Sequence, residues 1–168
     1  MTAKNRPDPK PFLAAVAAAC RQSGQPDASF RALDRALGQA IGHKLFTVLL
    51  HHRDTGESER FYSNQPEAYP VGGRKALNPT FWSQHVLRDQ KPYIGRTAAD
   101  IAAVFYDHEL IASLGCDSVL NLPVVFDGRT LGTLNLLDAA DHYDEADAEL
   151  GAIFAALAVP AYLKLVGG

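Results

Sequence analysis

Two apolar segments of similar length, residues 118–126 and 129–138, flank the dipeptide Asp127-Gly128. A dipeptide of this kind between two strand-like segments is among the strongest local signals of a β-hairpin. Adjacent hairpin strands pair antiparallel, so a chain that contains this hairpin must build its sheet at least partly from antiparallel neighbours. This feature limits the possible folds more than any other part of the sequence.

The side chains of this hairpin predict how its strands pair. If even-numbered residues lie opposite even-numbered residues, one face is almost purely apolar and the other carries Asn121, Thr133 and Asn135. Pairing even with odd would scatter polar groups over both faces, so we expect the first register. That register requires a loop of odd length at Asp127-Gly128, most simply three residues with a glycine bulge.

The remainder of the chain predicts short elements in the order helices, hairpin, short helices, hairpin, helix. This order is typical of an α+β fold rather than an α/β fold. Pro160 is expected to kink the last helix or to end it early. The expected elements are helices over 12–23 and 27–41, strands over 45–50 and 59–64, a loop over 65–78, a helix from Asn78-Pro79 to Asp89, a strand over 92–96, short helices capped by Thr97 and Asp107, and a last helix opened by Asp144 and Asp147.

Length, charge and cysteine content limit the function classes. With 168 residues the chain is expected to form one domain over 25–166, preceded by an N-terminal tail and helix over 1–24. Sixteen basic against 19 acidic residues argue against a nucleic-acid partner. The sequence has no uninterrupted run of about 18 apolar residues, which predicts no membrane span. Cys20 and Cys116 form no disulfide framework, which predicts a cytoplasmic setting.

The polar face of the second hairpin is the candidate binding site. Apolar walls combined with a few amide and hydroxyl groups are the usual composition of a small-ligand site. The alternative is that Asn121 and Asn135 hydrogen-bond each other and bind nothing. Aromatic residues of the preceding segments are candidates for the walls or roof of the site, or alternatively for plain core packing. They are Tyr62, Tyr69, Trp82, Tyr93, Phe105 and Tyr106.

The segment 114–138 resembles the closing hairpin of GAF domains, and its order Pro123, Gly128, Gly132 matches the core of that motif. The resemblance extends over about residues 27–165. It implies a six-stranded antiparallel sheet flanked by helices, an architecture similar to that of PAS domains and profilin. It also implies a ligand pocket on the sheet face away from the terminal helices, roofed by residues 65–110.

The resemblance implies three possible functions. The first is a sensor or regulatory domain that binds an unknown small molecule. The second is an interaction module without a ligand that forms a homodimer through its first and last helices. The third, a free methionine-sulfoxide reductase, is disfavoured because Val119, Asn135 and Leu137 stand where that family has acids, and Cys116 lacks a resolving partner. Attachment of a bilin is disfavoured because Asp117 follows Cys116, where phytochrome-like GAF domains usually have histidine.

Other patterns in the sequence are weaker. The run Gly72-Gly73-Arg74-Lys75 could form an anion-binding nest for the phosphate of a cyclic nucleotide, a known ligand of GAF domains, or could be a solvated surface loop. The histidines lack metal-ligand spacing, and the acids between 138 and 149 lack the spacing of an EF-hand. We therefore expect no metal, no cofactor and no catalytic residues.

Overall fold

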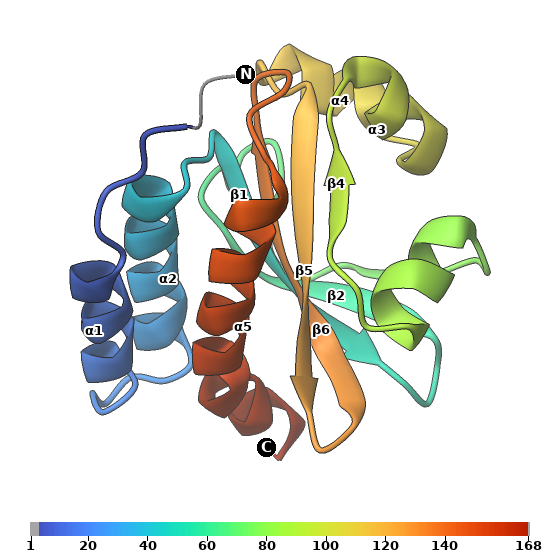
Figure 1. Ribbon diagram of the computed structural model, residues 1–168. Helices are drawn as coiled ribbons and strands as arrows, with labels where there is room; N and C mark the ends of the chain where they lie inside the picture. Colours follow the sequence, from blue (N-terminus) through green and yellow to red (C-terminus); the bar gives the residue numbers. More distant parts are fainter. Residues whose placement is uncertain (1–3, 168) are drawn as a thin grey trace.

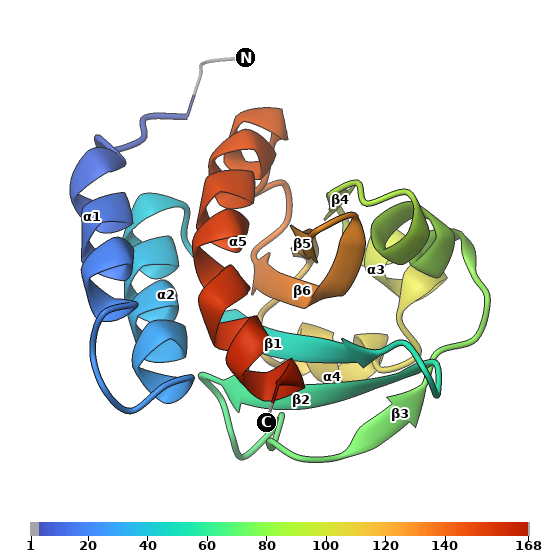
Figure 2. The ribbon, with the colours of Figure 1, turned by 90° about the horizontal axis from the view of Figure 1, so that it is seen from below.

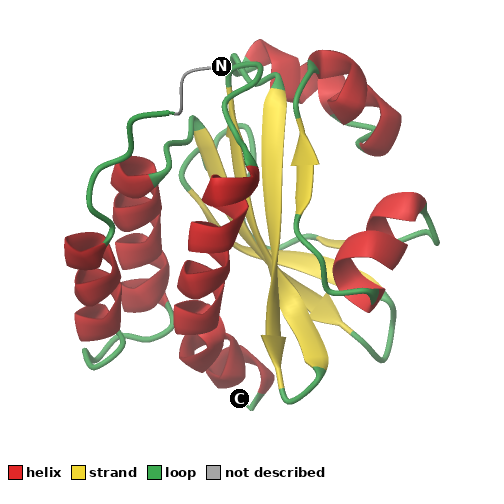
Figure 3. Cartoon of the chain, viewed as in Figure 1, coloured by secondary structure: helices red, strands yellow, loops and turns green. Residues whose placement is uncertain are grey.

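A six-stranded antiparallel sheet forms the centre of the molecule in the computed structural model, which describes residues 4–167. The strands follow the order β3-β2-β1-β6-β5-β4 across the sheet. Figure 3 shows the strands in yellow. This confirms the α+β class and the antiparallel sheet. The strands are β1 (Leu45–His52), β2 (Glu57–Ser63), β3 (Arg74–Ala76), β4 (Tyr93–Gly95), β5 (Ser118–Phe126) and β6 (Arg129–Asp138).

Helices cover both faces of the sheet. Helices α1, α2 and α5 form a layer on one face, and the remaining helices lie on the other (Figures 1 and 2). We call the second face the site face. The helices are α1 (Lys10–Ala19), α2 (Asp27–Ala40), the π-helix η1 (Ser83–Arg88), α3 (Ala98–Val104), α4 (His108–Ser113) and α5 (Glu145–Val166).

The second hairpin has the expected register but a different turn. Leu120 lies opposite Leu136 and Asn121 opposite Asn135, so even residues pair with even residues as predicted. The predicted three-residue loop is wrong, because Phe126 pairs directly with Arg129 across a two-residue turn. The extra residue is instead a bulge within β6, where the pairing shifts between Val124 and Val125.

The longest helix, α5, packs along the sheet. Phe154, Ala158 and Tyr162 are fully buried against the apolar strand face. Pro160 does not end the helix, which continues to Val166; Pro160 is exposed, so the carbonyl that it leaves without an N–H partner lies on the solvent side. Among residues 4–167, α5 is the one helix long and apolar enough to cross a membrane, a composition that a buried core helix shares.

Two of the predicted helix caps form as expected, and two do not. Thr97 with Asp100 and Asp144 with Asp147 make complete capping boxes. Asp107 makes no capping hydrogen bond to α4. The helical segment after Asn78-Pro79 begins later than predicted, because the backbone N–H groups and hydroxyls of Thr80 and Ser83 bond each other reciprocally.

The segment after the first hairpin differs from expectation, whereas the N-terminal helix forms. The predicted loop over 65–78 contains the short edge strand β3, paired with β2. Helix α1 packs on α2 and α5, and its Val16 is fully buried in the same apolar core as the sheet. The N-terminal helix therefore shares the core of the domain.

Candidate functional site

A row of polar side chains crosses the site face at the middle of the sheet. Thr47 of β1 lies opposite Asn135 of β6, which lies opposite Asn121 of β5. We call these three residues the amide row. The register places them on the site face because their strand neighbours Phe46, Leu120 and Leu136 point into the opposite, apolar core.

The amide row forms a directed chain of hydrogen bonds. The Asn121 Nδ2 donates to Asn135 Oδ1 at 2.7 Å, and Asn135 Nδ2 donates to Thr47 Oγ1 at 3.3 Å. All three side chains are buried, with at most 5% of each residue exposed. The two asparagines do bond each other, as the alternative interpretation of the sequence expected. The carbonyl of Asn121 is left to bind a group from outside the sheet.

Trp82 supplies that outside group. Its Nε1 donates to Asn121 Oδ1 at 2.9 Å, so the indole lies over the amide row. Phe105 packs edge-on against the indole, with ring centroids 6.1 Å apart. Tyr93, opposite Asn121 on β4, contacts the rings of Phe81 and His85. The indole thus occupies the position in which the sequence predicted a ligand.

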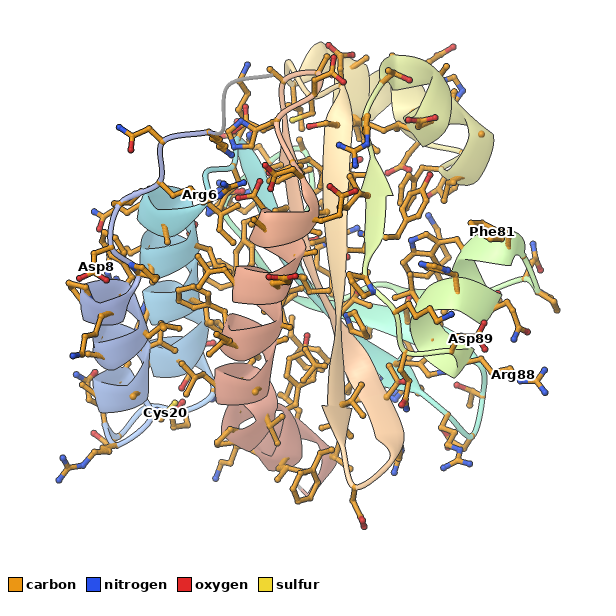
Figure 4. The ribbon with its side chains drawn as sticks, in the orientation of Figure 1. Arg6, Asp8, Cys20, Phe81, Arg88 and Asp89 are labelled. Carbon is orange, nitrogen blue, oxygen red and sulfur yellow. The ribbon has the colours of Figure 1, made fainter. Side chains whose placement is uncertain are left out.

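The indole stands at the start of η1, a complete turn of π-helix. π-Helical turns are rare and are frequent at functional sites. Val86 of η1 is buried and Thr130 of β6 donates to the Leu87 carbonyl at 2.7 Å, which ties this segment to the sheet. Phe81 and Arg88 lie on its outer side (Figure 4), and Phe81 is 68% exposed. The roof over the amide row therefore includes a helical turn whose outer side is exposed.

A shallow cavity adjoins the same helical turn. It has a volume of about 300 Å³, at the lower end of the range for small-ligand sites. His51 of β1 contributes to it, and burial lowers the pKa of this imidazole. The cavity is also lined by Leu77, Pro79, Ser83 and Leu87.

Tyr69 lies at the β3 side of the site face. It is buried beside Ile101 and Ile111, and its hydroxyl donates to Asp107 Oδ2 at 2.5 Å. Burial and this hydrogen bond raise the pKa of the Tyr69 hydroxyl. Asp107 thus bonds Tyr69 and makes no capping hydrogen bond to α4. Tyr69 therefore fixes the loop before β3 to the helical roof.

Tyr62 is separated from the other candidates. Its ring packs on Phe30 and Phe46, and its hydroxyl donates to Asp34 of α2 at 2.6 Å, on the opposite face of the sheet. The remaining candidates, Tyr69, Trp82, Tyr93, Phe105, Asn121, Thr133 and Asn135, belong to the site face. The separation arises from a bulge at Phe61, where the pairing of β1 and β2 shifts. We therefore leave Tyr62 out of the site.

Cys116 lacks the environment of a reactive thiol. It is 1% exposed, within the cluster of Tyr69 and Leu137. Burial raises the pKa of this thiol to about 11, and the charge of Asp138 acts in the same direction. The thiol therefore stays protonated near neutral pH, where the thiolate would be the nucleophile. Within residues 4–167 no cluster of three or more His, Cys, Asp or Glu side chains is arranged to hold a metal ion.

Sequence reasoning missed two residues of the site face. Thr47 is the single polar residue in the run 45–50, and that exception within a buried strand was a usable signal. Arg60, which shares the site face with the amide row, gave no such signal. Its side depends on the bulge at Phe61, which simple alternation along β2 does not predict.

Comparisons of the sequence and of the structure with known proteins indicate the same fold. A family profile for the GAF domain matches residues 16–161, while no curated protein matches the chain. The GAF domain of the Acinetobacter phosphoenolpyruvate-protein phosphotransferase superposes with a TM-score of 0.73 at 15% identity, over 94% of each chain. The Coxiella burnetii counterpart gives 0.73 at 16% identity, over 95% of this chain and 96% of that one. A phycocyanobilin-bound GAF domain from a cyanobacterial phytochrome gives 0.71 at 14% identity, over 97% and 98%.

Proposed function

The chain belongs to the GAF domain family, and we propose that it is a sensor domain that binds a small molecule between the amide row and the segment 65–110. The observation that carries this proposal is the hydrogen bond from Trp82 Nε1 to Asn121 Oδ1. It closes a buried polar chain with a side chain from an exposed helical turn. A ligand that offers its own donor to Asn121 can take the place of the indole.

The chemistry of the amide row indicates the kind of ligand. An asparagine side chain both donates and accepts hydrogen bonds, so a pair of them suits a neutral polar or zwitterionic group. Trp82, Phe105 and Tyr93 supply apolar contact area around it. The phycocyanobilin-bound relative is one GAF domain that carries a small molecule, which supports the proposal at the level of the fold.

The single tryptophan of the chain makes the proposal directly testable. A library of polar metabolites is screened for compounds that raise the melting temperature and also change the fluorescence of Trp82, the one Trp of the sequence. A true ligand displaces the indole from Asn121, so we expect a red shift of the emission and stronger quenching by acrylamide. At a ligand concentration 100 times the Kd, the stabilisation is about 2.7 kcal/mol.

Leucine substitutions provide the control for this screen. Asn135→Leu has a similar volume and removes the second amide, so it is expected to weaken binding of any hit at least tenfold. Asn5→Leu makes the same chemical change at an exposed residue of the N-terminal segment, outside the amide row and the segment 65–110, and should leave binding unchanged. Hits that bind Asn135→Leu as well as the unchanged protein would contradict the proposed site.

A second candidate function is supported by the outer face of α5. Ile153 is 50% exposed and Leu163 37% exposed, and Ala152, Ala156 and Pro160 continue this apolar face. Exposed helix faces of this kind are typical of interaction sites. Beyond Lys10 and Pro11 in its first turn, the exposed side of α1 carries alanines, among them Ala14 and Ala18. We therefore infer that α5, with α1 beside it, forms the interface of a homodimer.

Sedimentation equilibrium checks this second candidate. Ile153→Asp places a charge at the centre of the exposed α5 face and is expected to weaken dimerisation at least tenfold. Val71→Asp, at a residue that is 58% exposed on the loop before β3, serves as the matched control and should not change the association constant. A chain that sediments as a monomer at 100 times the concentration of the ligand assays would contradict the dimer.

The cysteines support a proposal about the cellular compartment. Cys20 and Cys116 are both free thiols in the structure. Free thiols are the usual state of cysteine in a reducing environment. We therefore propose that the protein works in the cytoplasm. Labelling with a thiol reagent after denaturation of rapidly quenched cell extracts tests the redox state of both residues, because Cys116 is buried in the native protein.

A further inference from the structure

Two cationic side chains lie together on the site face near its β3 edge. Lys75 of β3 is paired with Ser58 of β2, and Arg60 stands two residues from Ser58, so both side chains point to the same face. Arg60 is also opposite Leu49, which is opposite Thr133. This cross-strand row lies directly next to the amide row. Arg60 is therefore a neighbour of the proposed ligand site, and Lys75, opposite Ser58 and so in line with His51 of β1, extends the positive charge toward the β3 edge.

The guanidinium of Arg60 has an unused hydrogen-bonding edge. Its Nη1 donates to the Pro70 carbonyl at 3.0 Å, and its Cζ lies 4.8 Å from the centre of the Tyr69 ring. Its Nε is shielded from solvent and has no acceptor, and within residues 4–167 its Nη2 has none either. Nε and Nη2 are parallel donors, the geometry that binds a carboxylate or phosphate with two hydrogen bonds. A shielded donor without an acceptor is unfavourable, because the loss of its hydration is not compensated.

Lys75 adds a second free cation. Its Nζ lies 3.6 Å from the centre of the Tyr106 ring, a residue that is 74% exposed. In the described part of the chain it forms no ion pair, in contrast to its neighbour Arg74, whose Nε bonds Glu59 at 3.1 Å. Arg74 and Glu59 are paired in the ladder on the other face of the sheet. The anionic partners available on β2 are thus directed away from Lys75.

The charges around this pair do not balance. Asp107 is the carboxylate that influences both cations, and it already accepts the hydrogen bond of Tyr69. Two cations therefore face one engaged carboxylate. Burial lowers the pKa of Arg60 and of Lys75, as expected for cations without enough compensating charge. An anion bound here would restore the balance.

We propose that Arg60 and Lys75 bind an oxyanion group of the ligand, a carboxylate or a phosphate, while the amide row binds its neutral polar part. This inference rests on the proposed function, because it assigns the charge of the ligand at the same site. The proposal also assigns different roles to the two basic residues of the run Gly72-Gly73-Arg74-Lys75. Lys75 faces the site, and Arg74 pairs with carboxylates on the other face.

Nuclear magnetic resonance of the arginine side chains tests this proposal on the whole chain. Sodium phosphate and sodium acetate are titrated at constant ionic strength, with sodium chloride as the reference, and the Nε–H signal of Arg60 is followed. We expect a saturable shift with phosphate, acetate or both. A response to phosphate alone assigns a phosphate group, and a response to acetate alone assigns a carboxylate. A response no larger than that to chloride overturns the proposal.

Variants of adjacent residues on β3 provide the matched control. Lys75→Gln is expected to weaken anion binding at least fivefold, and Arg74→Gln, which removes the same charge from the other face, should change it less than twofold. Equal losses in the two variants would show a diffuse effect of net charge and overturn the site. Arg60→Gln removes the observed signal, so anion binding to this variant is measured as a rise in the melting temperature, which should be abolished. Lys75 is exposed, so the result for Lys75→Gln remains valid even if Arg60→Gln folds poorly.

Asn135→Leu separates this inference from the proposed function. If anions still bind to Asn135→Leu, and no metabolite in the screen depends on Asn135, the cationic pair stands and the amide site fails. If metabolites bind in an Asn135-dependent manner but Lys75→Gln has no effect on them or on anions, the amide site stands and this inference fails.

Discussion

Gly132→Ala is expected to destabilise the domain by about 3 kcal/mol or more. A Cβ atom at this position would lie 1.9 Å from the carbonyl oxygen of Leu49 and 2.6 Å from Cε1 of Tyr162. Neither neighbour can move freely, because the Tyr162 hydroxyl donates to the carbonyls of Leu49 and Thr133 at 3.0 and 2.9 Å. Gly132 therefore leaves room for a buried tyrosine that ties β1 and β6 to α5. Urea denaturation followed by circular dichroism measures the loss.

Gly73→Ala is the matched control for this substitution. No atom lies within 4 Å of a Cβ built on Gly73, so this variant should differ from the unchanged protein by less than about 0.5 kcal/mol. If Gly132→Ala is not recovered in the soluble fraction while Gly73→Ala is, the expected result is met. A Gly132→Ala protein as stable as Gly73→Ala would contradict the packing described.

Asp147→Ala is expected to cost about 2–4 kcal/mol, through the loss of a helix cap and of a buried ionic contact. The carboxylate of Asp147 is fully buried; it accepts from Arg6 Nε at 2.8 Å and from Lys4 Nζ at 3.4 Å. It also accepts from the backbone N–H of Asp144 in the capping box. Figure 4 shows Arg6 reaching from the N-terminal segment toward the start of α5. One side chain thus holds both the first turn of α5 and the N-terminal segment.

Two further variants distinguish the contacts of Asp147 from the effect of removing any acidic residue from α5. Glu149→Ala removes an exposed acid from the same helix and should change the free energy of unfolding by less than about 0.5 kcal/mol. Arg6→Ala should cost about 1–3 kcal/mol, because among residues 4–167 it leaves the buried carboxylate with Lys4 alone as a cationic partner. If Asp147→Ala and Glu149→Ala have equal stability, the ionic contact contributes nothing.

The part of the candidate site that lies on the second hairpin was predictable, because a short-range pattern of polar and apolar residues allows only one strand register. The alternation of the second hairpin placed Asn121, Thr133 and Asn135 on one face, because a buried apolar face tolerates only one register. The turn was misplaced because a three-residue loop and an internal bulge give the same offset between even positions. The sequence does not distinguish these two, and packing around Leu131 selected the bulge.

The roof of the site was predicted as a set of aromatic residues but not as an arrangement. Trp82 and Phe105 stand 23 positions apart in the sequence, and their contact depends on how η1 and the segment after α3 lie over the sheet. The donor for Asn121 is likewise supplied from another segment, by Trp82. Long-range partners of this kind have no local signal.

The antiparallel hairpin, its polar and apolar faces, and the capping boxes of α3 and α5 could be predicted from the sequence, because each depends on residues a few positions apart. The sides of Tyr62 and Arg60 depend instead on tertiary packing. Both are even-numbered residues of β2, yet the bulge at Phe61 directs Tyr62 toward Asp34 and Arg60 toward the site face. One extra residue in a strand reverses the alternation beyond it, and the packing of whole layers determines where that residue is accommodated.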